Sequence, residues 1–174
     1  IKAVGINLNL GCPSPDIIYG GGGAAMIKRV ARVREIVLIL SELGLPVTIK
    51  MRLGLNNYEK EKKVYLNLIR GVDCDGFIVH AQHARQKSSE KADWSVFSEL
   101  VMTGKKIIAN GNICTTDDLT YFSKLGISEV MIGREAMRNP SVFQVLKGGK
   151  GDSLSVVRAR YEKLCLKYPN HPKS

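Results

Sequence analysis

The sequence predicts a protein of the parallel α/β class. Short β-branched runs alternate five times with longer amphipathic runs along the 174 residues, and a helix must carry the chain back before each new strand can lie parallel to the previous one. Apolar residues make up 44% of the chain, which is enough to fill a core and excludes a wholly disordered or fibrous protein. The longest apolar runs fall well short of the roughly 20 residues that cross a bilayer, so we expect no membrane association.

The first two repeats have clear boundaries. Residues 6–10 form the first expected strand, and residues 32–43 carry apolar side chains at helical spacing until Gly44 ends the helix. A second strand is expected over residues 47–51, and a helix over residues 58–70 follows it.

The remaining repeats follow the same pattern. Thr115 and Asp118, three residues apart, resemble a capping pair at the start of the fourth helix. Gly133 and Arg134 open a further helical stretch after the fifth strand. The expected strands and helices lie at residues 76–79, 94–102, 106–109, 115–125 and 129–132.

A second unit begins after these repeats. Residues 148–151 are rich in glycine, and residues 154–168 again carry apolar side chains at helical spacing. We therefore divide the chain into βα repeats over residues 1–147 and a linker with the beginning of a helical region over residues 148–174. Eight βα repeats, the number in a closed barrel, need roughly 250 residues, whereas five repeats also suit a doubly wound sheet. The repeat pattern alone leaves both architectures open.

A cysteine follows the first expected strand, at the end where parallel α/β proteins carry their chemistry. Cys12 lies between Gly11 and Pro13 in a loop with no helix to shield it, so its thiol is a candidate nucleophile or proton donor. The alternative is a small buried apolar side chain, because free cysteines are commonly buried. The glycines over residues 20–25 lack the spacing of a dinucleotide-binding motif, and we expect them to form a flexible loop.

Three basic side chains are expected at the same end of the sheet. Lys50 and Arg52 lie two residues apart on the second strand and therefore share one face. Two cations near the end of a buried strand are costly unless they meet an anion or an electron-rich ligand, although structural ion pairs would also satisfy them. His80 ends the third strand at the same level, where a lone histidine is more often structural than functional.

Two short turns that contain glycine follow the last two strands. Asn110, Gly111 and Asn112 come after the fourth strand, and Gly133 and Arg134 after the fifth. Such turns lead into helices and expose backbone N–H groups that suit a phosphate. Two ordinary βα turns are the alternative.

The charge balance favours, weakly, an anionic partner such as a nucleic acid. Lys and Arg number 26 against 16 Asp and Glu, which gives a net charge of +10. Part of this charge lies in the alternating run over residues 59–63, which we expect to form one solvent-exposed helix face. The four cysteines show neither CxxC spacing nor a dense framework, so reduced thiols and a cytoplasmic location are expected.

Together these motifs resemble those of the dihydrouridine synthases, flavin enzymes that reduce uridine in transfer RNA. The likeness extends over about residues 5–145, and the order and spacing of the motifs hold throughout. Each motif alone is a modest signal, whereas the set is specific. The matching segments are residues 9–13 (N-x-G-C-P), 20–25, 50–54 (K-x-R-x-G), 79–80, 92–94, 110–113, 133–134 and 139–140.

The resemblance implies a TIM barrel of which this chain holds only the last five βα units, followed by the start of a C-terminal helical domain that grips tRNA. It also implies FMN at the carboxyl mouth of the barrel and NADPH as the upstream reductant. Cys12 would be the general acid that protonates C5 of the uracil while reduced FMN delivers hydride to C6. We expect the 174 residues by themselves to form an incomplete site, and we expect no protein partner.

The same resemblance assigns roles to individual residues. Lys50 and His80 would contact the flavin, while Asn9 and Arg52 would lie near the flavin and the uridine that is turned out of the RNA. The FMN phosphate would be held by Asn110, Gly111, Asn112, Gly133 and Arg134.

The chain departs from the resembled family at Asn112, where an acidic residue is frequent, and more strongly on one loop. Family members usually carry an arginine two residues after the strand histidine, whereas this chain has Gln82. Glu90 and Lys91 stand where a glycine and a proline are usual. We therefore expect substrate handling at this loop to differ.

Other functions share some of these motifs. An FMN-barrel dehydrogenase of the dihydroorotate or dihydropyrimidine kind has a similar N-x-x-C-P loop and strand lysine, and acts on a free pyrimidine. The K-x-R-x-G run and the basic charge favour the tRNA enzyme. A non-catalytic RNA-binding remnant is a further alternative, and a plain structural α/β domain is disfavoured because the motifs occur together.

Overall fold

The computed structural model describes residues 3–168 and contains one parallel sheet. Its five strands are β1 Ile6–Leu10, β2 Val47–Arg52, β3 Gly76–His80, β4 Ile107–Asn110 and β5 Val130–Met131. Each strand pairs with its neighbours in sequence, in the order β1-β2-β3-β4-β5. All five predicted strands are therefore confirmed, to within one residue at each end.

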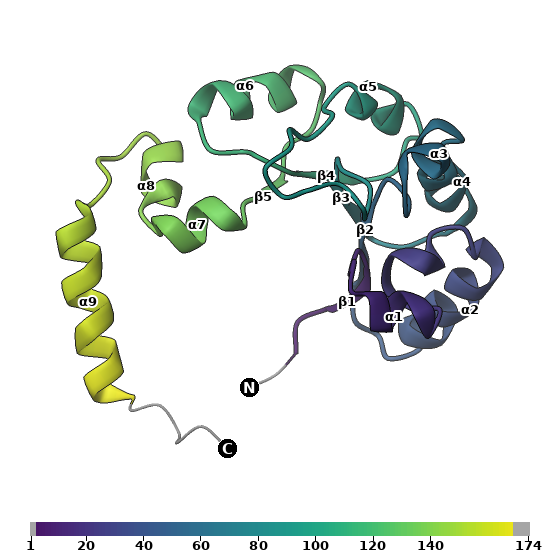
Figure 1. Cartoon of the computed structure of the whole chain (residues 1–174), viewed down its shortest axis with the longest axis horizontal. Helices are drawn as coiled ribbons and strands as arrows, with labels where there is room; N and C mark the ends of the chain where they lie inside the picture. Colours follow the sequence, from purple (N-terminus) through teal and green to yellow (C-terminus); the bar gives the residue numbers. More distant parts are fainter. Residues whose placement is uncertain (1–2, 169–174) are drawn as a thin grey trace.

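The strand order distinguishes the two architectures that the repeat pattern leaves open. A doubly wound sheet reverses its order and carries helices on both faces, whereas the wall of a (βα)8 barrel does neither. Here the order runs without reversal. Figure 1 shows the outer side of the curved sheet followed by α2 Val30–Ser41, α4 Val64–Gly71, α5 Val96–Val101 and α6 Thr116–Lys124. The chain therefore has an α/β fold consistent with part of a TIM barrel.

The hydrophobic core lies between the sheet and these outer helices. On β2, Ile49 and Met51 are buried and share a core cluster with Phe97 of α5. Because side chains alternate along a strand, the intervening Lys50 and Arg52 point to the inner face of the sheet. This alternation explains how two cations occupy a central strand without entering the core.

The register of the sheet aligns polar side chains near the carboxyl ends of the strands. Arg52 pairs with His80, and His80 pairs with Asn110 on β4. Two residues before Arg52 on β2, Lys50 pairs with Asn9 of β1. Residues in register on a parallel sheet point to the same face, so these five side chains share the inner face.

Three predicted helices are confirmed, with ends that differ by one or two residues: those over residues 32–43, 94–102 and 115–125. The predicted capping pair at the start of α6 is also confirmed. The Thr115 side chain accepts a hydrogen bond from the Asp118 N–H at 3.1 Å, and the Asp118 carboxylate accepts one from the Thr115 N–H at 2.8 Å.

The single helix predicted over residues 58–70 is wrong, because the structure has two helices there. α3 Asn57–Glu61 is separated from α4 at Lys63, whose φ of +52° lies in the left-handed region. A left-handed residue ends a right-handed helix. α4 starts again on a different anchor, since the buried Tyr65 donates its hydroxyl hydrogen to the Glu99 carboxylate on α5.

The charged run over residues 59–63 does not form one solvent-exposed face, contrary to the prediction. Glu59 is buried and pairs with Lys28 at 3.1 Å. Lys60 reaches Asp93 at 2.6 Å, in the segment that follows β3. The break between α3 and α4 directs these charges toward different neighbours, and so the run ties three parts of the chain together.

The glycine-rich segment over residues 20–25 is not the flexible loop that the sequence predicts. It folds into a short 3-10 helix, η1 Gly23–Met26, which packs against the loop after β1. The Ala24 N–H donates to the Cys12 carbonyl at 3.1 Å. Gly23 has a φ of +52°, and a Cβ there would lie 2.6 Å from that same carbonyl oxygen. Glycine is needed here for close packing rather than for mobility.

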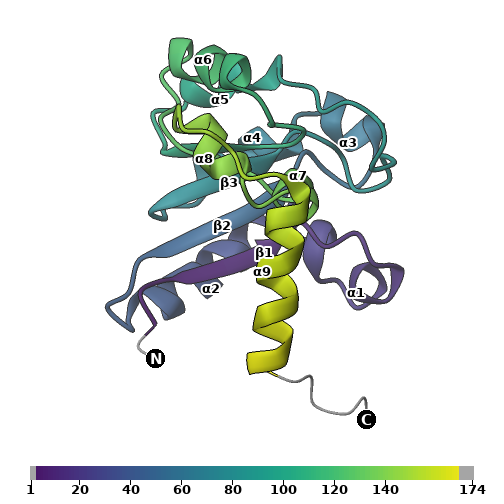
Figure 2. The ribbon, with the colours of Figure 1, turned by 90° about the vertical axis from the view of Figure 1, so that its left-hand side faces the viewer.

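Helices complete the described chain. α7 Arg134–Arg138 begins after Gly133 as predicted, α8 Val142–Leu146 is an addition, and α9 Leu154–Lys167 confirms the last predicted helix. α9 buries none of its residues. Figure 1 shows it apart from the sheet, and Figure 2 shows it from the side on which it lies. The division of the chain at residue 147 stays a prediction, and residues 169–174 lie outside the described part. Within residues 3–168, no helix combines the length and the apolarity of a membrane span.

Candidate active site

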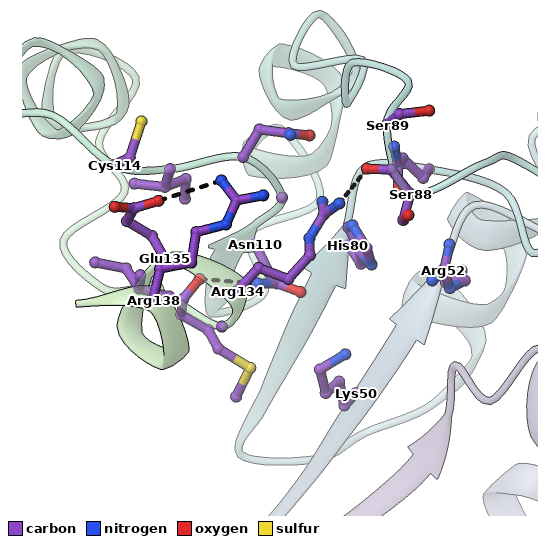
Figure 3. A pocket seen from close by; sticks show the side chains of 17 residues that line it. Lys50, Arg52, His80, Ser88, Ser89, Asn110, Cys114, Arg134, Glu135 and Arg138 are labelled. Atoms are coloured by element: carbon purple, nitrogen blue, oxygen red, sulfur yellow. Dashed lines mark hydrogen bonds and ion pairs between the residues drawn. The ribbon is translucent and has the colours of Figure 1, made fainter. Parts of the chain in front are cut away.

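A cavity of about 580 Å³ lies at the carboxyl ends of β2 to β5 (Figure 3). Its volume falls in the range of roughly 300–1,000 Å³ that is usual for small-molecule and cofactor sites. Eight of the ten predicted site residues line it, namely Lys50, Arg52, His80, Asn110, Gly111, Asn112, Gly133 and Arg134. The structure therefore brings these residues together, and their chemical roles stay predictions.

Lys50 carries an uncompensated charge into this cavity. Among residues 3–168, its ammonium group makes neither an ion pair nor a hydrogen bond, and Figure 3 shows it apart from the other labelled side chains. Burial, and then the positive charge of Arg52, lower the pKa of Lys50. A half-buried cation without a carboxylate partner is costly, so Lys50 is placed to receive an anionic or electron-rich ligand.

Arg52 joins the ends of three strands. Its Nε donates to the Gly11 carbonyl at 3.2 Å, just after β1, and its Nη1 donates to the His83 carbonyl at 3.2 Å, after β3. Burial and the charge of Arg134 lower the pKa of Arg52. Arg52 therefore fixes the loop that carries Cys12 and leaves part of its guanidinium group facing the cavity.

His80 is neutral at physiological pH. Burial, followed by the positive charges of Arg52, Lys50 and Arg134, lowers the pKa of His80 to about 4. Its Nε2 atom is buried and has no hydrogen-bond partner in the described chain. A neutral imidazole with an unused nitrogen is suited to hydrogen-bond a ligand without adding a further charge.

The turn after β4 packs closely against the His80 ring. Gly111 has a φ of +121°, and a Cβ there would lie 2.9 Å from the Ala92 Cβ and 3.0 Å from the His80 ring. The Gly111 carbonyl accepts a hydrogen bond from Trp94 Nε1 at 2.8 Å, and the Asn112 side chain accepts one from the Ala92 N–H at 3.1 Å. Only glycine allows this approach, and the segment around Trp94 thereby supports one wall of the cavity.

The capping of α6 limits what this turn can offer to an anion. The Asp118 carboxylate accepts the N–H groups of both Cys114 and Thr115, each at 2.8 Å. These donors are therefore already used by the protein. The backbone N–H groups of Gly111 and Asn112, which lie nearer the strand, stay available to a phosphate on this side.

Arg134 spans the cavity from the turn after β5. Figure 3 shows its guanidinium group reaching toward Ser88, whose carbonyl oxygen accepts a hydrogen bond from Nη1. Arg138 instead pairs with Glu135 on its own helix at 3.8 Å. A neutral carbonyl is a weaker partner for guanidinium than a phosphate, so an anion entering the cavity would compete for Arg134.

Cys12 and Asn9 are not brought onto the cavity wall with the other eight residues. The Asn9 side chain accepts a hydrogen bond from the Gly11 N–H at 3.0 Å, so it shapes the loop that precedes α1 Pro15–Tyr19. Cys12 is half-buried on that loop, next to the carbonyl that Arg52 holds. The loop that carries Cys12 therefore lies at the same end of the sheet as the cavity, and Arg52 contacts both the loop and the cavity.

Sequence reasoning missed two lining residues, Gln82 and Ser88, because they belong to an irregular segment. Gln82 is completely buried, and Ser88 lies on the loop that Arg134 reaches. That loop has no periodic pattern, and the only sequence signal was the departure from the resembled family at Gln82. The further lining residues are Ser89, Ile113, Cys114, Met131, Ile132, Glu135 and Arg138.

Strand order and cavity together define a parallel α/β protein, consistent with part of a βα barrel, whose basic, cofactor-sized cavity lies at the carboxyl ends of the strands. Comparison with known families gives the more specific assignment. The family model described as "Dihydrouridine synthase" matches residues 1–173, and the chain belongs to this family.

Curated relatives show the same likeness over four-fifths of the chain. A rat protein named "tRNA-dihydrouridine(47) synthase [NAD(P)(+)]-like" is 27% identical over 145 residues, which cover 82% of this chain and 23% of the relative. "Probable tRNA-dihydrouridine synthase 2" of Bacillus subtilis is 29% identical over 147 residues, covering 80% of this chain and 45% of the relative. A Staphylococcus aureus (strain Mu50) protein named "Probable tRNA-dihydrouridine synthase" is 30% identical, with 80% and 44% covered. The chain thus spans less than half the length of these relatives.

Proposed function

We propose that this chain is part of an FMN-dependent oxidoreductase that reduces uridine to 5,6-dihydrouridine in tRNA. The observation that carries the proposal is the convergence of Lys50, His80, Gly111 and Arg134, each expected from a separate motif, on one cavity. The printed names of the relatives support the same substrate. The names that include NAD(P) support NADPH as the reductant, and we place the reaction in the cytoplasm.

The cavity fits a flavin mononucleotide by the chemistry of its unused groups. The Lys50 ammonium lacks a carboxylate partner, and the buried Nε2 of His80 lacks a hydrogen-bond partner within residues 3–168. Arg134 would hold the phosphate together with the N–H groups of Gly111 and Asn112. When bound and reduced, FMN would supply the hydride that uridine reduction requires.

Cys12 would supply the proton. Reduction of the C5–C6 double bond needs a proton at C5 in addition to the hydride at C6, and a positioned thiol can act as the general acid. Arg52 holds the Gly11 carbonyl beside Cys12, and η1 holds the Cys12 carbonyl, so the loop has a fixed place next to the cavity. Lys50 would stabilise negative charge on the flavin, while the neutral His80 would orient the ring.

The uridine must leave the RNA stack to reach this site, because C5 and C6 are inaccessible within stacked bases. Unstacking costs a few kcal/mol, and contacts between basic side chains and RNA phosphates offset that cost. The net charge of +10 is consistent with such contacts.

The test uses cells that lack the gene encoding this chain. Dihydrouridine mapped across their tRNA should be absent from at least one position and restored by the wild-type gene. The Cys12→Ala gene should restore it poorly, because loss of a general acid slows turnover by about 10²–10⁴-fold. Cys74→Ala is the matched control, since Cys74 lies before β3 at the opposite end of the strands and should restore normal levels.

Two outcomes would contradict the proposal. A tRNA modification pattern unchanged by loss of the gene would remove the assigned substrate. Turnover of free uracil or orotate in preference to unmodified tRNA would instead identify a dehydrogenase of free pyrimidines. Unchanged turnover by Cys12→Ala would leave the activity in place but exclude Cys12 as the acid.

A further inference from the structure

Glu59 is the one charged residue that the fold buries within residues 3–168. Its carboxylate accepts a hydrogen bond from the Leu55 N–H at 2.8 Å and pairs with Lys28 at 3.1 Å. The Lys28 side chain is 55% exposed, so water alone could satisfy its ammonium group. Burial of a carboxylate is costly, and apolar residues often stabilise such a position equally well or better. The charge of Glu59 therefore needs an explanation other than overall stability.

The backbone next to Glu59 brings its helix close to the end of β2. Gly54 has a φ of +136°, and a Cβ there would lie 2.8 Å from the Glu59 Cβ. The Asn56 side chain, at the start of α3, accepts a hydrogen bond from the Glu59 N–H at 3.0 Å. These contacts fix the carboxylate against the turn at Leu55, three residues beyond Arg52.

Two routes join the end of β2 to the loop that carries Cys12. The first is the hydrogen bond from Arg52 to the carbonyl of the residue before Cys12, at 3.2 Å. The second runs through Glu59 to Lys28, which lies two residues beyond η1, and η1 donates to the Cys12 carbonyl at 3.1 Å. Breaking the ion pair should loosen η1, and with it the Cys12 loop, while the first route stays in place.

We propose that Glu59 is a positioning residue for Cys12. Through Lys28 its carboxylate holds η1 against the turn after β2, and η1 holds the loop that carries the thiol. The proposal rests on the proposed function for the role of Cys12 as an acid, but the contacts themselves all lie within residues 11–59 and involve no ligand.

The reactivity of the Cys12 thiol reports the freedom of this loop without any cofactor. The alkylation rate of each cysteine in the purified full chain is measured with iodoacetamide and peptide mass spectrometry, from about pH 7 to 10. Lys28→Met removes an exposed ammonium group, and it should raise the plateau rate of Cys12 about three- to tenfold because a loosened loop opens more often. Lys28→Arg keeps a cation beside Glu59 and should keep the wild-type rate. A purely electrostatic effect on the thiolate would instead shift the midpoint of the pH profile.

Glu59→Gln tests the other side of the ion pair. The glutamine oxygen can still accept the Leu55 N–H, so the change weakens mainly the link to Lys28. It should raise the Cys12 rate as Lys28→Met does, and an unchanged rate would overturn the proposal. If Glu59→Gln does not fold, the exposed Lys28→Met change decides alone.

Lys60 offers a matched control on the same helix as Glu59. It pairs with Asp93 at 2.6 Å, in the segment after β3, so its ion pair leads away from η1. Lys60→Met removes the same charge and should leave the Cys12 rate unchanged. Cys74, before β3 at the opposite end of the strands, serves as an internal control for general loosening of the fold.

Three alkylation results would overturn the proposal: an unchanged Cys12 rate in Lys28→Met, an equal increase at Cys74, or the same increase in Lys60→Met. Dihydrouridine mapping in cells that lack the gene then tests the role in turnover. Lys28→Met should restore dihydrouridine less well than the wild-type gene and Lys28→Arg, and full restoration by Lys28→Met would exclude the positioning role. A wild-type gene that restores none would contradict the proposed function, whereas the alkylation rates would still decide how the loop is held.

Discussion

Positive charge concentrated around one imidazole decides the ionisation of the candidate site. Lys50, Arg52 and Arg134 all lower the pKa of His80 in addition to the effect of burial, and no carboxylate contributes to the shift. The site thus keeps its formal charges on lysine and arginine and leaves His80 as a neutral group. A fourth cation at this point would be repelled by the other three, which is the physical reason for the division of roles.

The lowered pKa of His80 makes stability depend on pH in a definite direction. The imidazole takes up its proton near pH 6.5 when unfolded but only near pH 4 when folded, so the unfolded chain binds more protons between these values. Stability should therefore fall as the pH drops from about 6.5 toward 4. Replacing His80 by glutamine should reduce this slope, by at most the equivalent of one proton, in urea unfolding measured from pH 4.5 to 7.

The choice of window separates His80 from other titrating groups. Asp93, Glu99 and Asp118 have lowered pKa values, and so they titrate mainly below pH 4.5. His83 also has a pKa lowered by burial and by Lys60, but it is present in both proteins and cancels in the comparison. Equal slopes for the wild-type chain and His80→Gln would show that His80 is not held in the neutral form.

Gly111 and Gly126 provide a paired test of crowding at the candidate site. Both have positive φ, +121° and +82°, but a Cβ at Gly111 would meet Ala92 and His80, whereas at Gly126 nothing lies within 4 Å. Gly126→Ala should cost about 1 kcal/mol of unfolding free energy for its backbone alone. Gly111→Ala should cost about 1–3 kcal/mol more through overpacking, and should also weaken FMN binding. Equal losses of unfolding free energy for the two variants in denaturant unfolding would mean that the turn accommodates the added Cβ by moving.

At the scale of elements, the start of α6 is the best-defined local structure next to the site. Thr115 and Asp118 satisfy each other's backbone N–H groups, and Asp118 also takes the N–H of Cys114. The helix therefore begins at a fixed place, with its N-cap Thr115 three residues beyond Asn112. This fixes the turn that is proposed to face a phosphate.

Removing this cap should lower stability by a measurable amount. Thr115→Ala loses the side-chain acceptor for the Asp118 N–H and should cost about 1 kcal/mol, within a range of roughly 0.5–2. Thr120→Ala removes a hydroxyl that only donates to the Thr116 carbonyl on the exposed face of the same helix, so it should change stability by less than about 0.5 kcal/mol. Urea unfolding of both variants checks the difference, and an equal loss would contradict a special role for the cap.

Elements were predictable from sequence where periodicity and a terminator agreed. The strands and α2 follow apolar patterns that end at a glycine or a polar turn, and the cap of α6 has its own sequence signature. The break at Lys63 was not predictable, because the residue has no turn preference and its left-handed backbone follows from tertiary anchors such as the Tyr65–Glu99 bond. The packing of η1 on the Cys12 loop is likewise set by contacts distant in sequence.

At the scale of the molecule, the cavity was predictable to the extent that it depends on strand ends. Parallel strands bring their carboxyl ends to one edge of the sheet. Because the strand order also runs without reversal, the residues that follow each strand lie close together at that edge. Gln82 and Ser88 could not be found in this way, because they reach the cavity through the irregular loop after β3. The attachment of the Cys12 loop to Arg52 depends on a side-chain hydrogen bond that no sequence period encodes.

Because the net charge is +10, the affinity for RNA should fall as salt is raised. We expect this salt dependence to arise mainly from basic side chains at one end of the molecule. Arg85 and Lys87 are exposed on the loop beside the cavity and form no ion pair within residues 3–168, so both are available to RNA phosphates. Replacing both by alanine should lower tRNA affinity and reduce the slope of log Kd against log salt by about 2, one for each lost phosphate contact.

The control removes the same charge from the opposite end of the strands. Lys105 and Lys106 precede β4 and pair with Asp73 at 2.8 Å and Glu129 at 2.6 Å. If RNA binds at the carboxyl ends, the double alanine variant of these lysines should keep the wild-type slope in filter-binding titrations between about 50 and 200 mM salt. Equal losses from the two pairs would mean that tRNA responds to overall charge alone. The RNA would then make no specific contact with the cavity end. Long-range attraction depends on the net charge of the protein, whereas counterion release depends on which side chains contact the phosphates.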